Sequence, residues 1–144
     1  MQLSWDKIKS GLFLWRCEIQ GGISMDDVSG APEPDHLYVV WTSGDREVAL
    51  KMVFMYTNNS KLKGWWKNVC LIVWGPSAKL LTVDPELQDY IARMQHVGVE
   101  VVACKACADA YGVTPLLEAM GIEVKPMGEP LTHLLKEGRT VITF

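Results

Sequence analysis

The segment "VCLIVWGPSAKLLTVDPELQDYIARMQHVGVEVVAC", Val69–Cys104, decides the fold class because it contains a complete strand–helix–strand pattern. Its first six residues, 69–74, are continuously apolar, as in a strand that is buried on both faces. Its last part, "VEVVA" at 99–103, is a second apolar strand that runs directly into Cys104. Two buried strands joined by a helix cannot form a hairpin, so they predict a parallel pair.

The helix between these two strands has recognisable ends. Asp84 is the expected N-cap, and Pro85 is the expected first helical residue. The apolar stripe of this helix consists of Leu87, Tyr90, Ile91 and Met94. Gly98 ends the helix, because glycine after a helix adopts positive φ without a Cβ clash. The residues Gly75-Pro76-Ser77 close the first strand and precede the helix.

The same alternation continues on both sides of this segment. Further strands are expected at 37–41, 122–127 and 140–144, and further helices at about 45–57, 105–111, 114–120 and 130–136. The apolar stripe of the first of these helices consists of Ala49, Met52, Val53 and Tyr56. A glycine followed by an apolar residue recurs at Gly98-Val99, Gly112-Val113 and Gly121-Ile122, which is typical of helix C-caps whose next residue packs back on the helix. Right-handed crossovers then predict an α/β domain with a flavodoxin-like three-layer fold and a five-stranded, mainly parallel sheet.

The first 34 residues do not follow this plan. Residues 18–35 are rich in Gly, Pro and Asp, and 12–19 is a candidate for an extra strand. The sequence therefore predicts an N-terminal extension at 1–34, of uncertain structure, and one α/β domain at 35–144.

Composition limits the classes of function. The chain has 144 residues, 49% apolar and 22% charged, with a formal net charge of −3. This charge excludes a general nucleic-acid binder, which needs a basic face. No apolar stretch approaches the roughly 20 residues that span a bilayer, and the N-terminus does not resemble a secretory signal. Four cysteines are too few for a disulfide scaffold, so a reducing, cytoplasmic location is expected.

The candidate site follows from the sheet. Open parallel sheets bind ligands at the carboxyl ends of their strands. The residues expected there are the candidate binding residues Thr42, Ser43, Gly44, Gly75, Ser77 and Lys105, together with the segment 127–129 and the two cysteines of "CKAC", Cys104 and Cys107. We expect no cofactor, since the sequence has no nucleotide-binding fingerprint.

Cys104 is the strongest nucleophile in this set. It ends a buried strand and opens a helical turn, where unpaired backbone N–H groups and the helix dipole favour a thiolate. Lys105 adds a neighbouring positive charge, and Cys107 lies one turn further on. Both cysteines are therefore candidate catalytic residues.

Several interpretations of this pair remain open. A structural zinc site needs four ligands and only one Cys-x-x-Cys is present, so no metal is expected. A thiol–disulfide pair is a stronger alternative, although no Trp or Pro accompanies the motif. A single nucleophilic Cys104, with Cys107 as helper or bystander, is preferred. The plain alternative is that both are small core residues, and it is the preferred interpretation of Cys17 and Cys70.

Four segments of the chain resemble the DsrE/DsrF-like family of small sulfur-relay proteins. They are "VWTSGDREVALKMVFMYTNNSKLKGWW" (40–66), "LIVWGPSAKLL" (71–81), "CKACADAYGV" (104–113) and "KPMGEPLTHLLKEGRTVITF" (125–144). The resemblance covers about Leu37–Phe144 and is greatest to a branch that carries this Cys-x-x-Cys. It implies a five-stranded, mainly parallel domain that assembles into trimers or hexamers, and a cysteine that carries sulfane sulfur as a persulfide between donor and acceptor proteins.

Cys104 matches the family's carrier cysteine, because Gly98-Val99 precedes it and Gly112-Val113 follows it. Cys107 has no counterpart there. Three functions are therefore weighed: a persulfide carrier using Cys104, a redox protein using both cysteines, and a non-catalytic subunit that binds a small ligand. Trp65-Trp66 and a helix bearing methionines favour a homotrimer or homohexamer over a monomer.

Overall fold

A computed structural model of the chain describes residues 35–144. The N-terminal extension expected at 1–34, with its candidate strand at 12–19, lies outside the described residues. None of the helices within 35–144 is long and apolar enough to cross a membrane.

One parallel sheet organises the described part of the chain. Its strands are β1 (His36–Trp41), β2 (Asn68–Val73), β3 (Glu100–Cys104), β4 (Glu123–Lys125) and β5 (Thr140–Thr143). They lie in the order β4-β3-β2-β1-β5, and every neighbouring pair is parallel. The α/β fold with a five-stranded parallel sheet, predicted from the alternation of strands and helices, is therefore confirmed.

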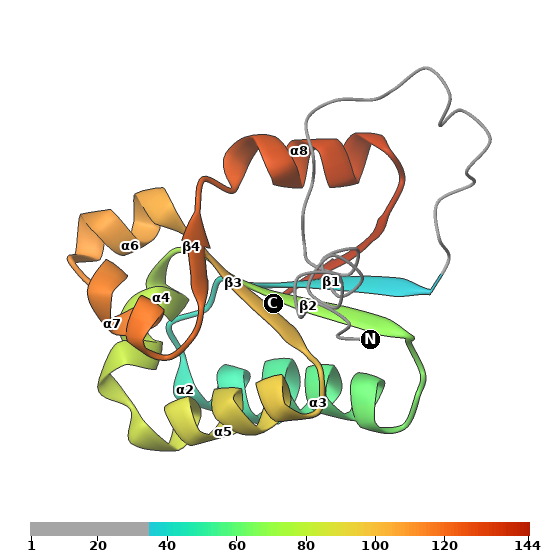
Figure 1. Cartoon of the computed structure of the whole chain (residues 1–144), viewed down its shortest axis with the longest axis horizontal. Coiled ribbons are helices and arrows are strands. Elements are labelled where there is room, and N and C mark those ends of the chain that lie inside the picture. Colours follow the sequence, from blue (N-terminus) through green and yellow to red (C-terminus); the bar gives the residue numbers. More distant parts are fainter. Residues whose placement is uncertain (1–34) are drawn as a thin grey trace, which may run out of the picture.

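The helices cover both faces of the sheet (Figure 1). They are α2 (Arg46–Val48), η2 (Ala49–Phe54), α3 (Met55–Leu62), α4 (Pro76–Val83), α5 (Pro85–His96), α6 (Lys105–Tyr111), α7 (Thr114–Ala119) and α8 (Gly128–Lys136). Figure 1 shows α8 on one face, α2, α3 and α5 on the other, and α4, α6 and α7 gathered near the carboxyl ends of the strands. The result is the three-layer arrangement expected from right-handed crossovers.

Two hydrophobic clusters form the core, one on each face of the sheet. Within the described residues the larger contains 21 buried residues, including Val39, Trp41, Phe54 and Leu117. The smaller contains 8, including Val102, Cys104, Met127 and Leu134 of α8. Alternate residues of the same strands supply the two clusters, because successive side chains of a strand point to opposite faces.

The expected helix ends are confirmed. The Asp84 carboxylate accepts hydrogen bonds from the backbone N–H groups of Glu86 and Leu87, as an N-cap does. Gly98, Gly112 and Gly121 all have positive φ, and the residues after them are buried. The backbone N–H groups of these following residues, Val99, Val113 and Ile122, donate back to helix carbonyls at 2.9, 2.9 and 3.2 Å.

The first helix differs from the prediction in length and in its buried face. It continues to Leu62 rather than ending near 57, and its middle section, η2, has π-helical turns. A wider turn displaces the buried face by about one residue, so Phe54 is fully buried while Met52 is 51% exposed. The predicted stripe was correct for Ala49 and Val53 and wrong for Met52.

Helix α4 was not predicted. Its N-terminal signal, Gly75-Pro76, was interpreted only as the end of the preceding strand. Pro76 is the first helical residue, a position where the missing N–H costs no hydrogen bond. At the other end of the domain, β4 covers only part of the strand expected at 122–127, since Pro126 cannot donate to a strand ladder. Helix α8 correspondingly begins at Gly128 rather than Pro130.

Candidate functional site

The carboxyl ends of the parallel strands meet at one edge of the sheet, where α4 and α6 begin (Figure 1). Cys104 is both the last residue of β3 and the N-cap of α6, with extended backbone angles of φ −69° and ψ 116°. A strand that turns directly into a helix therefore places this thiol at the edge, as the sequence predicted. The side chain of Cys104, the N-cap residue, makes no capping hydrogen bond to α6.

The two thiols lie together. The side chain of Cys104 lies near enough to Cys107 to raise the pKa of the Cys107 thiol through hydrogen bonding and charge. Both belong to or pack on the smaller hydrophobic cluster, beneath α8. Cys104 is only 4% exposed, whereas Cys107 is half-buried, so the open side of the pair is the Cys107 side.

The surroundings of Cys107 favour its protonated form. Burial raises the pKa of the Cys107 thiol, a hydrogen bond from the backbone N–H of Gly75 lowers it, and the contact with Cys104 raises it again. The net effect is a pKa above the ordinary value. Cys107 is therefore suited to remain an S–H donor beside Cys104.

Gly75 brings a second strand end into the site. It follows β2, has φ +68°, and is the N-cap of α4. Positive φ of this kind favours glycine, and the backbone N–H of Gly75 lies near enough to Cys107 to lower the pKa of its thiol. Gly75 is thus the predicted binding residue that the structure places in direct contact with a cysteine.

The residues after β1 lie at the same edge of the sheet, and most of their contacts are to neighbouring loops and helix ends. Thr42 donates to the Phe144 carbonyl through its backbone N–H at 2.8 Å and its hydroxyl at 2.7 Å. The Ser43 hydroxyl accepts from the backbone N–H of Asp45, which is the N-cap of α2. A Cβ at Gly44 would lie 3.1 Å from the Pro76 Cβ, so glycine lets the two loops pass closely.

Ser77 lies beneath the surface at the carboxyl edge of the sheet. It is fully buried, and its hydroxyl lies 2.6 Å from the Trp41 carbonyl oxygen and 2.9 Å from the Trp74 carbonyl oxygen. It also accepts from the Trp74 backbone N–H at 3.1 Å. These contacts join the ends of β1 and β2 to α4. The geometry gives Ser77 a role in holding the loops.

Lys105 lies on the outer side of α6. Its ammonium pairs with the Asp109 carboxylate at 3.0 Å, and the side chain is 49% exposed. A hydrogen bond from the Thr114 hydroxyl and this lysine lower the pKa of Asp109. Part of the positive charge expected beside Cys104 is therefore balanced by Asp109.

Lys125 is a further residue near the site that sequence reasoning missed. It pairs in register with Cys104 across β3 and β4. The preceding pair, Ala103 and Val124, packs on the larger cluster, so Cys104 and Lys125 share the opposite face. The register between two strands is not readable from either strand alone, which is why this neighbour was not identified.

Metal binding has no support from the described residues. Within 35–144, no three side chains of His, Cys, Asp or Glu lie together in a way that would hold a metal ion. In general, a thiolate can attack a sulfur atom of another molecule and expel a second thiolate.

Comparison with known proteins agrees with this fold. The DsrE/DsrF-like family model matches residues 45–144. The structure of BT1422, a conserved protein of unknown function from Bacteroides thetaiotaomicron, is 37% identical, with a TM-score of 0.74, over 76% of this chain and 95% of that one. The ychN protein from E. coli is 16% identical, with a TM-score of 0.58, over 76% and 98% of the two chains, and shows the fold alone.

No curated protein matches the chain. The family model nevertheless covers more than half of the sequence, and BT1422 aligns over nearly its whole length. The chain therefore belongs to the DsrE/DsrF-like family, a family of sulfur-relay proteins.

Proposed function

We propose that this protein carries sulfane sulfur as a persulfide on Cys104. The Cys104 thiolate attacks the outer sulfur of a donor persulfide, the donor S–S bond breaks, and the donor leaves as a thiolate. The proton of the outer sulfur stays with it, which leaves a persulfide on Cys104. An acceptor thiolate then attacks that outer sulfur, and Cys104 leaves as a thiolate.

The observation that carries this proposal is the contact between the two sulfur atoms at the strand–helix junction. The raised pKa of Cys107 keeps it protonated, so it donates a hydrogen bond to the sulfur that must bear negative charge in the second step. The partly exposed Cys107 side gives donor and acceptor proteins their route to Cys104. A reducing compartment such as the cytoplasm suits this chemistry.

The same contact favours a second function, in which the two thiols form a reversible disulfide. The two cysteines lie three residues apart at the start of one helix, and the side chain of Cys104 acts on the Cys107 thiol. Cys107 would then attack the inner sulfur of the Cys104 persulfide, forming the disulfide and releasing hydrosulfide. The two functions differ in whether Cys107 is needed for turnover.

One experiment separates them. Wild-type protein, Cys104→Ser and Cys107→Ser are each incubated with glutathione persulfide and analysed by intact-mass spectrometry. A carrier gains one sulfur atom in the wild type and in Cys107→Ser but not in Cys104→Ser. An adduct that survives Cys104→Ser contradicts the proposal. Loss of two hydrogen atoms instead, abolished in Cys107→Ser, supports the disulfide reaction.

We also propose that the protein works as a homotrimer or homohexamer. Met52, Met55 and Trp65 are about half exposed, and they line an apolar groove beside the edge strand β5, together with Ile142 and Phe144. Large apolar side chains gathered on one surface are typical of interfaces. This supports the assembly expected from Trp65 and from the methionine-bearing helix.

A further inference from the structure

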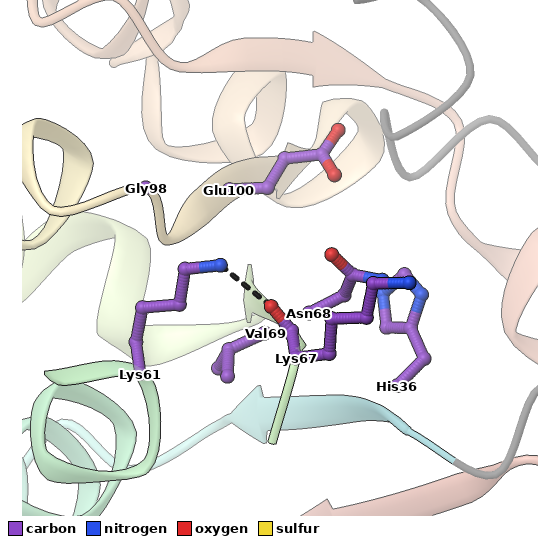
Figure 2. Close-up of a pocket in the computed structure, with 7 residues that line it drawn as sticks. All are labelled: His36, Lys61, Lys67, Asn68, Val69, Gly98 and Glu100. Carbon is purple, nitrogen blue, oxygen red and sulfur yellow. Dashed lines mark hydrogen bonds between the residues drawn. The ribbon is translucent and has the colours of Figure 1, made fainter. Parts of the chain in front are cut away.

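Cys104 is covered by side chains although it lies at an edge of the sheet, since only 4% of its surface is exposed. Two cavities of the described part of the chain lie elsewhere. One, of about 340 Å³, opens at the amino ends of β1, β2 and β3, where the Lys61 ammonium donates to the Lys67 carbonyl (Figure 2). The other is the apolar groove beside β5. Because a thiol reacts only as far as a reagent can reach it, the side chains that cover Cys104 decide what reaches its sulfur.

Trp74 is the neighbour of Cys104 on the β2 side. In the register between β2 and β3, Val73 pairs with Ala103, and both belong to the larger cluster. The next residues, Trp74 and Cys104, face the opposite side of the sheet, because successive side chains of a strand alternate. The Trp74 backbone N–H still donates to the Trp41 carbonyl at 3.0 Å, which continues the hydrogen bonding of the sheet. Trp74 accordingly packs against the smaller cluster, which contains Cys104.

The Trp74 side chain lies between this cluster and solvent. It is partly buried, so part of the indole packs on the cluster and part is exposed. Neighbouring strands are about 4.8 Å apart, which is close to the separation of about 5 Å at which a sulfur atom and an aromatic ring attract each other. The indole is therefore suited to cover the Cys104 sulfur and a second sulfur atom bound to it. The partly exposed Cys107 lies on another side of this thiol.

We propose that Trp74 shields the sulfur carried on Cys104 from small thiols in solution. This inference rests on the proposed persulfide function. The shield slows attack by a glutathione thiolate on the outer sulfur, a reaction that breaks the S–S bond, releases the Cys104 thiolate and leaves the persulfide on glutathione. With Trp74 on the β2 side, the approach that remains is beside the partly exposed Cys107. The carrier then passes its sulfur to a protein thiol that docks on the Cys107 side, before free thiols remove it.

The first test measures the accessibility of the Cys104 thiol without any persulfide. Wild-type protein and Trp74→Ala are alkylated with iodoacetamide, and trypsin, which cleaves after Lys105, places the two cysteines on separate peptides for mass spectrometry. Trp74→Ala is expected to speed the alkylation of Cys104 at least about fivefold, and the ratio of the Cys104 rate to the Cys107 rate should rise at least about threefold. Equal Cys104 rates in the two proteins, or an equal increase at both cysteines, overturn the proposal.

Further comparisons separate shielding from other effects. Trp66→Ala removes another partly buried indole, which packs on the larger cluster, and should leave the Cys104 rate unchanged. A Cys104 rate that rises as much in Trp66→Ala as in Trp74→Ala overturns the proposal. The increase should be the same at about pH 7 and about pH 10, because a lowered thiol pKa would raise the rate only at the lower pH. An increase confined to the lower pH also overturns the proposal.

Trp74→Leu keeps a smaller apolar side chain and tests the proposal even where Trp74→Ala fails to fold. It should speed the alkylation of Cys104 at least about twofold, and a rate equal to that of the wild type overturns the proposal.

The second test follows the carried sulfur itself. Wild-type protein and Trp74→Ala are loaded with glutathione persulfide, freed of donor, and treated with excess glutathione, and the loss of the added sulfur is followed by intact-mass spectrometry. Trp74→Ala should lose this sulfur at least about fivefold faster, and equal rates of loss overturn the proposal. If the wild type forms no sulfur adduct on Cys104, the proposed function fails, whereas the alkylation rates still report whether Trp74 covers the thiol.

Discussion

Ser77→Ala tests whether the loops around the cysteines are held by a buried hydroxyl. The hydroxyl donates to the carbonyl of Trp41 or Trp74 and accepts from the Trp74 N–H. The Trp74 N–H and the Trp41 carbonyl also bond to each other at 3.0 Å, so they keep a partner in the variant. The Trp74 carbonyl loses its Ser77 partner.

The magnitude follows from this inventory. A lost hydrogen bond costs about 1 kcal/mol, and a buried carbonyl left without a partner costs about 1–3 kcal/mol more. Because two of the three main-chain groups retain a bond, we expect a total near the lower part of this range, about 2 kcal/mol. In a domain of this size that lowers the Tm by about 5–10 °C.

Calorimetry or thermal circular dichroism measures the effect, and Ser43→Ala is the matched control. The Ser43 hydroxyl accepts a backbone hydrogen bond from an exposed N–H that water can replace, so its loss should change stability by less than about 0.5 kcal/mol. If Ser77→Ala is as stable as Ser43→Ala, the hydroxyl does not hold the loops, and its place in a ligand site must be reconsidered.

Two further predictions concern an ion pair and the surface. The Arg46 guanidinium forms an ion pair with the Asp84 carboxylate. Partial desolvation raises the pKa of Asp84, but this ion pair and the backbone N–H groups of α5 lower it more, so its pKa lies below the ordinary 3.8. The ionised Asp84 therefore stabilises the fold at pH values above 3.8, and this stabilisation is lost as the pH falls through the lower pKa of the folded state. The Tm difference between wild type and Arg46→Met should accordingly shrink from about pH 7 to about pH 2. A Tm difference that stays constant over this range would contradict the prediction. Trp65→Ser should reduce the assembly mass in light scattering, while Leu116→Ser, an equally exposed residue of α7, should not; an unchanged mass for Trp65→Ser would place the interface elsewhere.

The fold was predictable because its signals are local. Apolar runs of five or six residues, the Asp84 N-cap and glycines after three helices each fix one element, and the elements alternate in an order that admits few topologies. Cys104 was placed correctly for the same reason, since a strand that ends in a cysteine must present it at the carboxyl edge.

The structure differs from the sequence prediction at positions whose surroundings are formed by several segments of the chain. Met52 fits the apolar stripe of an ideal α-helix, but the π-helical turns of η2 rotate its side chain toward solvent. No single residue of the sequence predicts these π-helical turns. Ser77 looks like a loop residue until the ends of β1 and β2 are brought together above it. The neighbour of Cys104 on β4, Lys125, depends on strand register, and the cavity at the amino ends joins residues from four elements.

The two hydrophobic clusters on the two faces of the sheet differ in size, and the two cysteines lie on the side of the smaller one. Within residues 35–144 the larger cluster, with 21 buried side chains, contributes most of the hydrophobic free energy, and the thiols lie with the 8 buried residues of the other side. Substitutions beneath α8 therefore disturb a minor share of the apolar packing. Residues around the two cysteines can therefore be substituted at a smaller cost in hydrophobic free energy than residues of the larger cluster.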